Sequence, residues 1–195
     1  MMNVFDIIAA ILGLVCVFLA GRGSKYNFYV GYLYSAALFL LFWERNLLAS
    51  LMLQPVSLVI NAVGHYRWTH PREGEASSEK AGDLKVSTLS TAGRFISVAM
   101  VLVVAAVWGM LLDRLFPADP HPYLDSCLTI LILVAQTLSA LKKWDCWVAW
   151  LFVNIVQLAL HLSVGNVCMS VVSALYLANS IVSIRQWIAK FRRNA

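Results

Sequence analysis

Charge is scarce in this sequence of 195 residues: Asp, Glu, Lys and Arg make up 13% of the chain, whereas hydrophobic residues make up 61%. With a mean hydropathy of +0.74, this composition excludes a soluble domain and is typical of a helical membrane protein with several spans. A span needs about 20 apolar residues, and we expect seven, at 4–20, 26–43, 47–66, 93–112, 124–141, 146–163 and 167–186. Little chain remains for extramembrane domains, so the function must lie within the membrane.

Catalytic and metal-binding patterns are also missing. Neither HExxH nor GxSxG occurs, and no acidic residue falls in the middle of a span, so nothing indicates a nucleophile with its base or a carboxylate cluster. The four cysteines lie within the spans at no metal-ligand spacing and are interpreted as apolar packing residues: Cys16, Cys127, Cys146 and Cys168. We therefore expect no cofactor and no metal, and an intramembrane enzyme is the weaker alternative.

Coupling to an ion gradient is not indicated either. Proton and sodium relays usually need charged side chains inside the membrane, and the middle of every span lacks Asp, Glu, Lys and Arg. His161 lies near the outer end of a span, where a histidine is more often a hydrogen-bonded interfacial residue than a proton relay. We expect an uncoupled carrier.

The basic residues are distributed unevenly along the chain. With seven spans and an outside N-terminus, 13 of the 15 lysines and arginines fall on the inner side, leaving Arg45 and Arg114 outside. This asymmetry predicts an outside N-terminus and a cytoplasmic C-terminus, and it explains the net charge of +5 without a nucleic-acid partner. The first span has no basic region before it and no convincing cleavage site, so we expect it to be retained.

A repeat of 119 residues divides the chain. This spacing matches Asp6 with Asp125 and Trp68 with Trp187, across three spans each time. It predicts an all-α fold with two parallel three-helix repeats at 1–68 and 124–187. Between them we expect a flexible cytoplasmic linker at 69–92 and a connecting helix with its outer loop at 93–123, and after them a basic tail at 188–195.

One face of span 146–163 is polar and aromatic. Spacings of three and four residues align Trp147, Trp150, Asn154, Gln157 and His161 on that face. An unpaired amide facing lipid would cost several kcal/mol, so the face must point inward, toward neighbouring helices or a ligand.

A second polar stripe, of Gln54, Ser57 and Asn61, lies in span 47–66. Pro55 interrupts the backbone hydrogen bonds beside it and is interpreted either as a hinge or as a static kink. In span 167–186, Tyr176 and Asn179 are further candidates for ligand contact.

Indoles and amides suit a ring compound with hydroxyl groups. Indole faces stack on heteroaromatic rings or attract a ring cation, while Asn and Gln donate to and accept from ribose or carboxamide groups. The alternative is that Trp147 anchors the interface and the amides only bridge helices, as in a structural membrane subunit. Four residues together favour a ligand site where the repeats meet: Trp150, Asn154, Gln54 and Asn61.

The chain resembles the PnuC family of bacterial vitamin transporters over nearly its whole length. The likeness rests on LLASLMLQ at 47–54, the spacing from Gln54 to Asn61, the GHYRW ending at Trp68, LDSC at 124–127, the paired Lys142 and Lys143, and WVAWLFVN at 147–154. Two places depart from the family pattern: His65 stands where a tryptophan is usual, and Pro55 to Leu58 replace an aromatic run.

This resemblance implies a three-plus-one-plus-three arrangement of the SWEET type in the bacterial cytoplasmic membrane. It implies facilitated diffusion of nicotinamide riboside, trapped by cytoplasmic phosphorylation, with thiamine, riboflavin or a deoxynucleoside as alternatives. It also implies that Gln54, Asn61, Trp147, Trp150 and Asn154 touch the substrate, and that the protein forms a homotrimer.

Overall fold

The computed structural model describes residues 4–44, 48–77, 83–115 and 122–194. Within them lie seven helices: α1 (Val4–Gly21), α2 (Tyr26–Glu44), α3 (Leu48–Thr69), α4 (Thr91–Leu115), α5 (Pro122–Ala140), α6 (Cys146–Ser163) and α7 (Val167–Asn194). The prediction of an all-α fold with seven helices is confirmed. Arg45, Lys80 and the loop 116–121, which entered the sequence predictions, lie outside the described residues.

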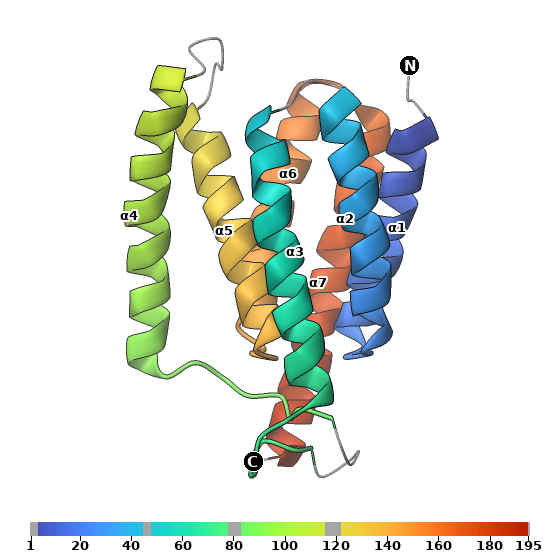
Figure 1. Ribbon diagram of the computed structural model, residues 1–195, viewed down its shortest axis with the longest axis vertical. Coiled ribbons are helices and arrows are strands. Elements are labelled where there is room, and N and C mark those ends of the chain that lie inside the picture. Colours follow the sequence, from blue (N-terminus) through green and yellow to red (C-terminus); the bar gives the residue numbers. More distant parts are fainter. Residues whose placement is uncertain (1–3, 45–47, 78–82, 116–121, 195) are drawn as a thin grey trace.

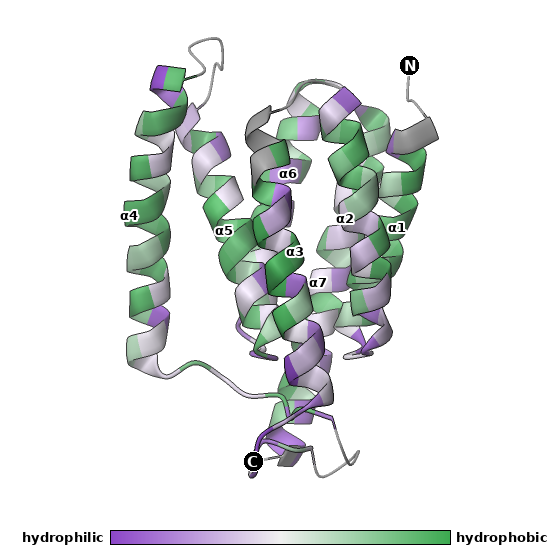
Figure 2. Ribbon diagram, viewed as in Figure 1, coloured by the Kyte–Doolittle hydropathy of each residue, from purple (hydrophilic) through white to green (hydrophobic). Residues whose placement is uncertain are grey.

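Length and hydropathy identify the helices that can cross a bilayer. Among the described residues, α4, α5, α6 and α7 are each long and apolar enough, and α1 contributes a shorter apolar stretch, Asp6–Gly21. Figure 2 shows hydrophilic residues gathered around the ends of α3 and α7 and along the segment that joins α3 to α4. The fold thus has at least four candidate spans, with its polar surface concentrated at one end.

Six of the helices form a closed ring. Helix α1 packs on α2, α2 on α3, α3 on α5, α5 on α6, α6 on α7, and α7 on α1. In Figure 1 the odd-numbered helices run from the end where the chain begins to the end where it finishes, and the even-numbered helices run back. We call these the N-terminal end and the C-terminal end, and we call α1–α3 and α5–α7 the first and second three-helix groups.

Helix α4 stands outside this ring. Among the described helices it packs on α5 alone, as Figure 1 shows at the left of the bundle. Ser126 of α5 donates a hydrogen bond to the backbone oxygen of Ala105 at 2.5 Å. Large apolar side chains cover the rest of α4, with Phe95 73% and Leu102 63% exposed, so this face suits contact with lipid.

The two groups meet at both of their junctions through the same contact. The indole nitrogen of Trp68 in α3 donates to the backbone oxygen of Ala140 in α5 at 3.1 Å. The indole nitrogen of Trp187 in α7 donates to the backbone oxygen of Gly21 in α1 at 2.8 Å. Trp187 follows Trp68 by 119 residues, and Ala140 follows Gly21 by the same number.

Four aromatic rings close the C-terminal end of the ring interior, and we call them the aromatic plug. Phe28 packs edge-on against Trp68 with ring centroids 5.0 Å apart, and Trp147 packs likewise against Trp187 at 5.7 Å. Trp68 and Trp187 lie 5.8 Å apart and join the two pairs. The three tryptophans are at most 1% exposed, so the plug belongs to the buried core.

The segment between α3 and α4 is ordered where it passes beneath the plug. Leu84 and Val86 are each 4% exposed and pack in the same cluster as the plug tryptophans. The amide of Ser87 donates to the oxygen of Lys142 at 3.1 Å, and the amide of Trp144 donates to the oxygen of Ser87 at 3.0 Å. Residues 83–90, which lie within the segment predicted as a flexible linker, thus pack against the end of the ring, and we call them the strap.

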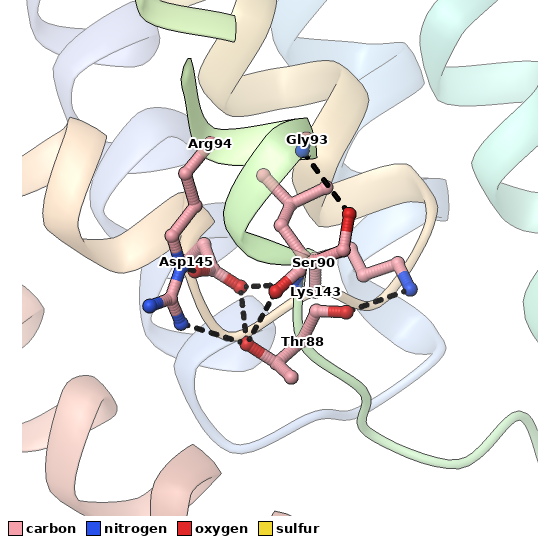
Figure 3. A network of polar contacts seen from close by, with 7 residues as sticks. Thr88, Ser90, Gly93, Arg94, Lys143 and Asp145 are labelled. Carbon is pink, nitrogen blue, oxygen red and sulfur yellow. Dashed lines mark hydrogen bonds and ion pairs between the residues drawn. The ribbon is translucent and has the colours of Figure 1, made fainter. Parts of the chain in front are cut away.

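Asp145 fastens the strap to the turn between α5 and α6 (Figure 3). Its carboxylate accepts hydrogen bonds from the Thr88 hydroxyl at 3.0 Å and the Leu89 amide at 2.9 Å. It also pairs with Arg94 of α4 at 2.8 Å, and Lys143 donates to the backbone oxygen of Thr88 at 3.1 Å. The strap and the start of α4 are thus tied to the second three-helix group.

Helix α7 continues past the predicted end of its span. Residues 188–194, predicted as a separate basic tail, extend the helix. Phe191 packs against the cluster that holds the plug, and the Lys190 ammonium donates to the backbone oxygen of Arg22 at 2.6 Å. These contacts explain why the helix does not stop at the membrane boundary.

Candidate functional site

Three cavities follow one another through the interior of the ring. A vestibule of about 710 Å³ lies at the N-terminal end, bordered by Asp6, His161 and Asn166. A central cavity of about 340 Å³ and an inner cavity of about 130 Å³ lie nearer the plug. Neighbouring cavities share lining residues, so together they form a tapering path that ends at Trp147 and Phe28.

All six ring helices contribute to the central cavity. Its lining consists of Val17, Tyr34, Ser35, Leu38, Phe42, Leu53, Gln54, Ser57, Thr129, Ile132, Leu133, Gln136, Trp150, Asn154, Gln157 and Tyr176. Among these described residues none carries a formal charge. The lining offers four side-chain amides, several hydroxyls and one indole, which suits a ligand with an aromatic ring and neutral hydrogen-bonding groups.

Most of the candidate residues from the sequence lie on this path. The central cavity receives Gln54, Ser57, Trp150, Asn154, Gln157 and Tyr176. Asn61 and Trp147 line the inner cavity instead. Trp147 precedes Trp150 by about one helical turn, so one face of α6 lines first the closed end of the path and then the central cavity.

Two candidates lie away from the cavity walls. The Asn179 side chain donates to the backbone oxygen of Val17 at 3.2 Å and links α7 to α1. Pro55 lies inside α3 on its exposed side, next to the cavity residue Gln54. The structure thus separates these two from the residues that a ligand would touch.

Two asparagines of the path also hold helices together. The Asn154 amide nitrogen donates to the Ser180 hydroxyl at 2.9 Å, and Asn154 is only 4% exposed. The Asn61 amide nitrogen donates to the backbone oxygen of Phe28 at 3.1 Å. Each amide is thereby fixed in orientation, and the carbonyl oxygen of each remains an acceptor for a ligand donor.

Several lining residues were not among the candidates from the sequence. Gln136 of α5 lines the central and inner cavities, and its amide oxygen is buried without a hydrogen-bond partner. Tyr34 lines all three cavities. Gln136 could have been found as a buried amide in an apolar span, whereas Tyr34 is one of several tyrosines on α2, and the sequence does not tell them apart.

Comparison with known proteins gives one family. The family model described as nicotinamide mononucleotide transporter matches residues 3–189. The chain is 22% identical to the nicotinamide riboside transporter PnuC of Escherichia coli, over 96% of this chain and 86% of the relative. It is 29% identical to the riboflavin/roseoflavin transporter RibM of Streptomyces davaonensis, over 97% of this chain and 87% of the relative.

A solved structure has the same fold. The crystal structure of the vitamin B3 transporter PnuC matches with a TM-score of 0.77 at 24% sequence identity, covering 96% of this chain and 82% of that chain. The seven-helix arrangement described above is thus PnuC-like over nearly the whole chain.

Proposed function

This chain belongs to the nicotinamide mononucleotide transporter family, and on that premise we propose that it carries nicotinamide riboside across the membrane by facilitated diffusion. As a member it is a multi-pass membrane protein and a vitamin transporter of the PnuC type, not an enzyme. The choice of vitamin and the mode of transport are our proposal.

The lining of the central cavity is the observation that carries the proposal. Trp150 offers an indole face on which a pyridinium ring can stack with a favourable cation-π contact. The amides of Gln54, Asn154 and Gln157 offer donors and acceptors for a ribose and a carboxamide. A neutral cavity suits a ligand whose single positive charge is delocalised over a ring.

The path through the ring supports an outward-facing state. The vestibule leads to the central cavity from the N-terminal end, while the aromatic plug and the strap close the C-terminal end. We place the N-terminal end outside the cell and the C-terminal end in the cytoplasm, because most basic residues gather at the latter. Ligand would enter from outside and leave when the plug opens.

We further propose that the two three-helix groups are repeats that rock against each other. The matched contacts of Trp68 and Trp187 support this, because they join the groups at both junctions with the same spacing of 119 residues. Pro55 would act as a pivot, since a proline inside a helix removes one backbone hydrogen bond and eases bending.

Calorimetry on the detergent-purified protein tests the substrate. Nicotinamide riboside, riboflavin and thiamine are titrated separately into the wild type and into Trp150→Ala. We expect the wild type to give a heat of binding with nicotinamide riboside and with neither other vitamin, and we expect Trp150→Ala to give none. Heat from none of the three vitamins would refute the proposed substrate.

Riboflavin is the second candidate. The 29% identity to RibM exceeds the 22% identity to PnuC of Escherichia coli, and Trp150 could equally stack on a flavin ring. Heat from riboflavin alone in the same titration would favour this alternative.

Uptake into proteoliposomes tests the pivot. Pro55→Ala restores a backbone hydrogen bond in α3 and should slow uptake several-fold while the dissociation constant of the ligand stays unchanged. Uptake at the wild-type rate would remove Pro55 from the mechanism.

A further inference from the structure

Tyr34 and Tyr176 lie where the vestibule meets the central cavity. Both side chains line both cavities. Both side chains also lie against Gly13 of α1, although α2 and α7 are not in direct contact among the described helices. The two tyrosines thus bridge two helices of different three-helix groups at the entrance to the candidate site.

Gly13 of α1 lies directly against both tyrosine side chains. A Cβ atom added at Gly13 would lie 3.1 Å from Cζ of the Tyr34 ring and would overlap the Tyr176 hydroxyl. Only glycine therefore lets the two tyrosines lie directly against α1. Any side chain at this position would push the pair away from α1 and into the passage.

The remaining side chains common to the two cavities are Leu38, Phe42 and Gln157. A ligand on its way to Trp150 must pass between these residues and the tyrosine pair. Aromatic rings are rigid, and the backbone of α1 at Gly13 lies directly behind both tyrosines, so the passage cannot widen on this side unless α1 or the tyrosine pair moves.

We propose that the Tyr34–Tyr176 pair sets the width of this passage, and so admits a nucleoside with a single aromatic ring and rejects a fused three-ring flavin. The choice of these two ligands rests on the proposed function, whereas the width of the passage does not. Tyr176→Ala widens the passage, and Gly13→Ala narrows it.

The first experiment measures uptake of nicotinamide riboside and riboflavin into proteoliposomes. In Tyr176→Ala we expect the ratio of riboflavin to nicotinamide riboside uptake to rise on the order of tenfold, the scale of discrimination by pocket shape. In Gly13→Ala we expect uptake of both to fall. Tyr29→Ala is the control, because it removes a tyrosine ring from α2, the helix of Tyr34, at a position that is 54% exposed. An unchanged ratio in Tyr176→Ala would overturn the proposal.

The second experiment does not depend on the ligand. Ser57, which lines the central cavity, is changed to cysteine after the four native cysteines have been replaced by serine. A small methanethiosulfonate and a bulky maleimide, both membrane-impermeant, are then applied from outside to whole cells. Tyr176→Ala should raise the rate of labelling by the bulky reagent more than the rate of labelling by the small one. Gly13→Ala should lower the rate for the bulky reagent more than for the small one. Tyr29→Ala should change neither rate.

The two experiments separate the two proposals. Labelling that follows this pattern without uptake of either vitamin would refute the proposed function and support the passage. Uptake of nicotinamide riboside with equal labelling rates in all variants would support the function and overturn the passage. If Tyr176→Ala fails to fold, Tyr34→Ala removes the other ring of the pair, and faster labelling of this variant by the bulky reagent decides in the same way.

Discussion

Trp187 lies 119 residues after Trp68, and the indole of each donates a hydrogen bond to a backbone oxygen of the other three-helix group. Trp150 lies 119 residues after Gly31, which has no side chain to match its indole. The first pair belongs to the aromatic plug and the second to the candidate site. Along the cavity the differences continue, because Asn154 corresponds in spacing to Ser35, and Gln136 to Val17.

The two regions face different demands. If the two groups move against each other, as proposed above, a plug between them closes best when each contributes the same surface, as in an isologous interface. A small vitamin has no such symmetry, so its ring and its hydroxyls need different partners on different sides. We infer that the second three-helix group supplies three of the four amides and the indole, while the first supplies Gln54 and the hydroxyls of Tyr34, Ser35 and Ser57.

Removing the indole from the site should have the largest effect. In Trp150→Ala we expect the affinity for nicotinamide riboside to fall about 10- to 100-fold, because stacking of an aromatic ring is worth about 1–3 kcal/mol in alanine substitutions. Calorimetry measures the dissociation constant. Phe152→Ala is the control, since Phe152 lies on the same helix and is 59% exposed. Equal losses in both variants would place the ligand elsewhere.

The corresponding positions Asn154 and Ser35 test the asymmetry of the cavity directly. Asn154→Ala should weaken binding by roughly tenfold through the loss of one well-oriented hydrogen bond. Ser35→Ala should weaken it less than Asn154→Ala does. Calorimetry again gives the affinities, and thermal unfolding checks that loss of the bond to Ser180 has not unfolded the protein. A larger loss of affinity in Ser35→Ala than in Asn154→Ala would contradict the inference that the second three-helix group makes the stronger polar contacts.

Matched substitutions in the plug test its symmetry. Trp68→Phe and Trp187→Phe each leave a buried backbone oxygen without its indole donor, which costs about 1–3 kcal/mol. We expect similar reductions in the free energy of unfolding, with a slightly larger one for Trp68, which also lies under the Lys142 ammonium at 4.4 Å. Denaturation in detergent measures both. A strong effect at one tryptophan only would show that the two junctions are not equivalent.

The smallest effect is expected in the vestibule, where His161 follows Phe42 by 119 residues and both line the same cavity. His161→Phe makes the two positions alike. Because we expect no proton coupling, uptake by the variant should equal uptake by the wild type at every pH from roughly 5.5 to 8. A pH dependence that is present in the wild type and lost in the variant would argue for coupling.

The sequence predicted the elements of the fold and much of the site. Hydrophobic spans bounded by polar residues located all seven helices, and helical spacing identified the inward faces of α3 and α6. For this reason Gln54, Ser57, Trp150 and Asn154 were correctly predicted to point inward. Helical spacing gives the face of a helix, however, and not the depth at which a cavity ends, so the sequence could not tell that Trp147 both lines the inner cavity and forms part of the plug.

The strap and Tyr34 could not be predicted for a different reason. Leu84 and Val86 are buried only because Trp68 and Trp187 lie above them, and Asp145 holds Thr88 across a separation of 57 residues. Such long-range contacts leave no periodic pattern in a polar segment. Tyr34 depends likewise on Gly13 and Tyr176, which come from two other helices.

Helix α4 bears on how the protein is made. It has the highest mean hydropathy of the four candidate spans, 2.6, yet among the helices that the structure describes it packs on α5 alone. During synthesis a segment this apolar can partition into the bilayer without waiting for its neighbours. Because α4 runs back to the end where α1 begins, α5 starts from that same end, and the second group has the orientation of the first. The least connected helix thereby sets the direction of half the chain.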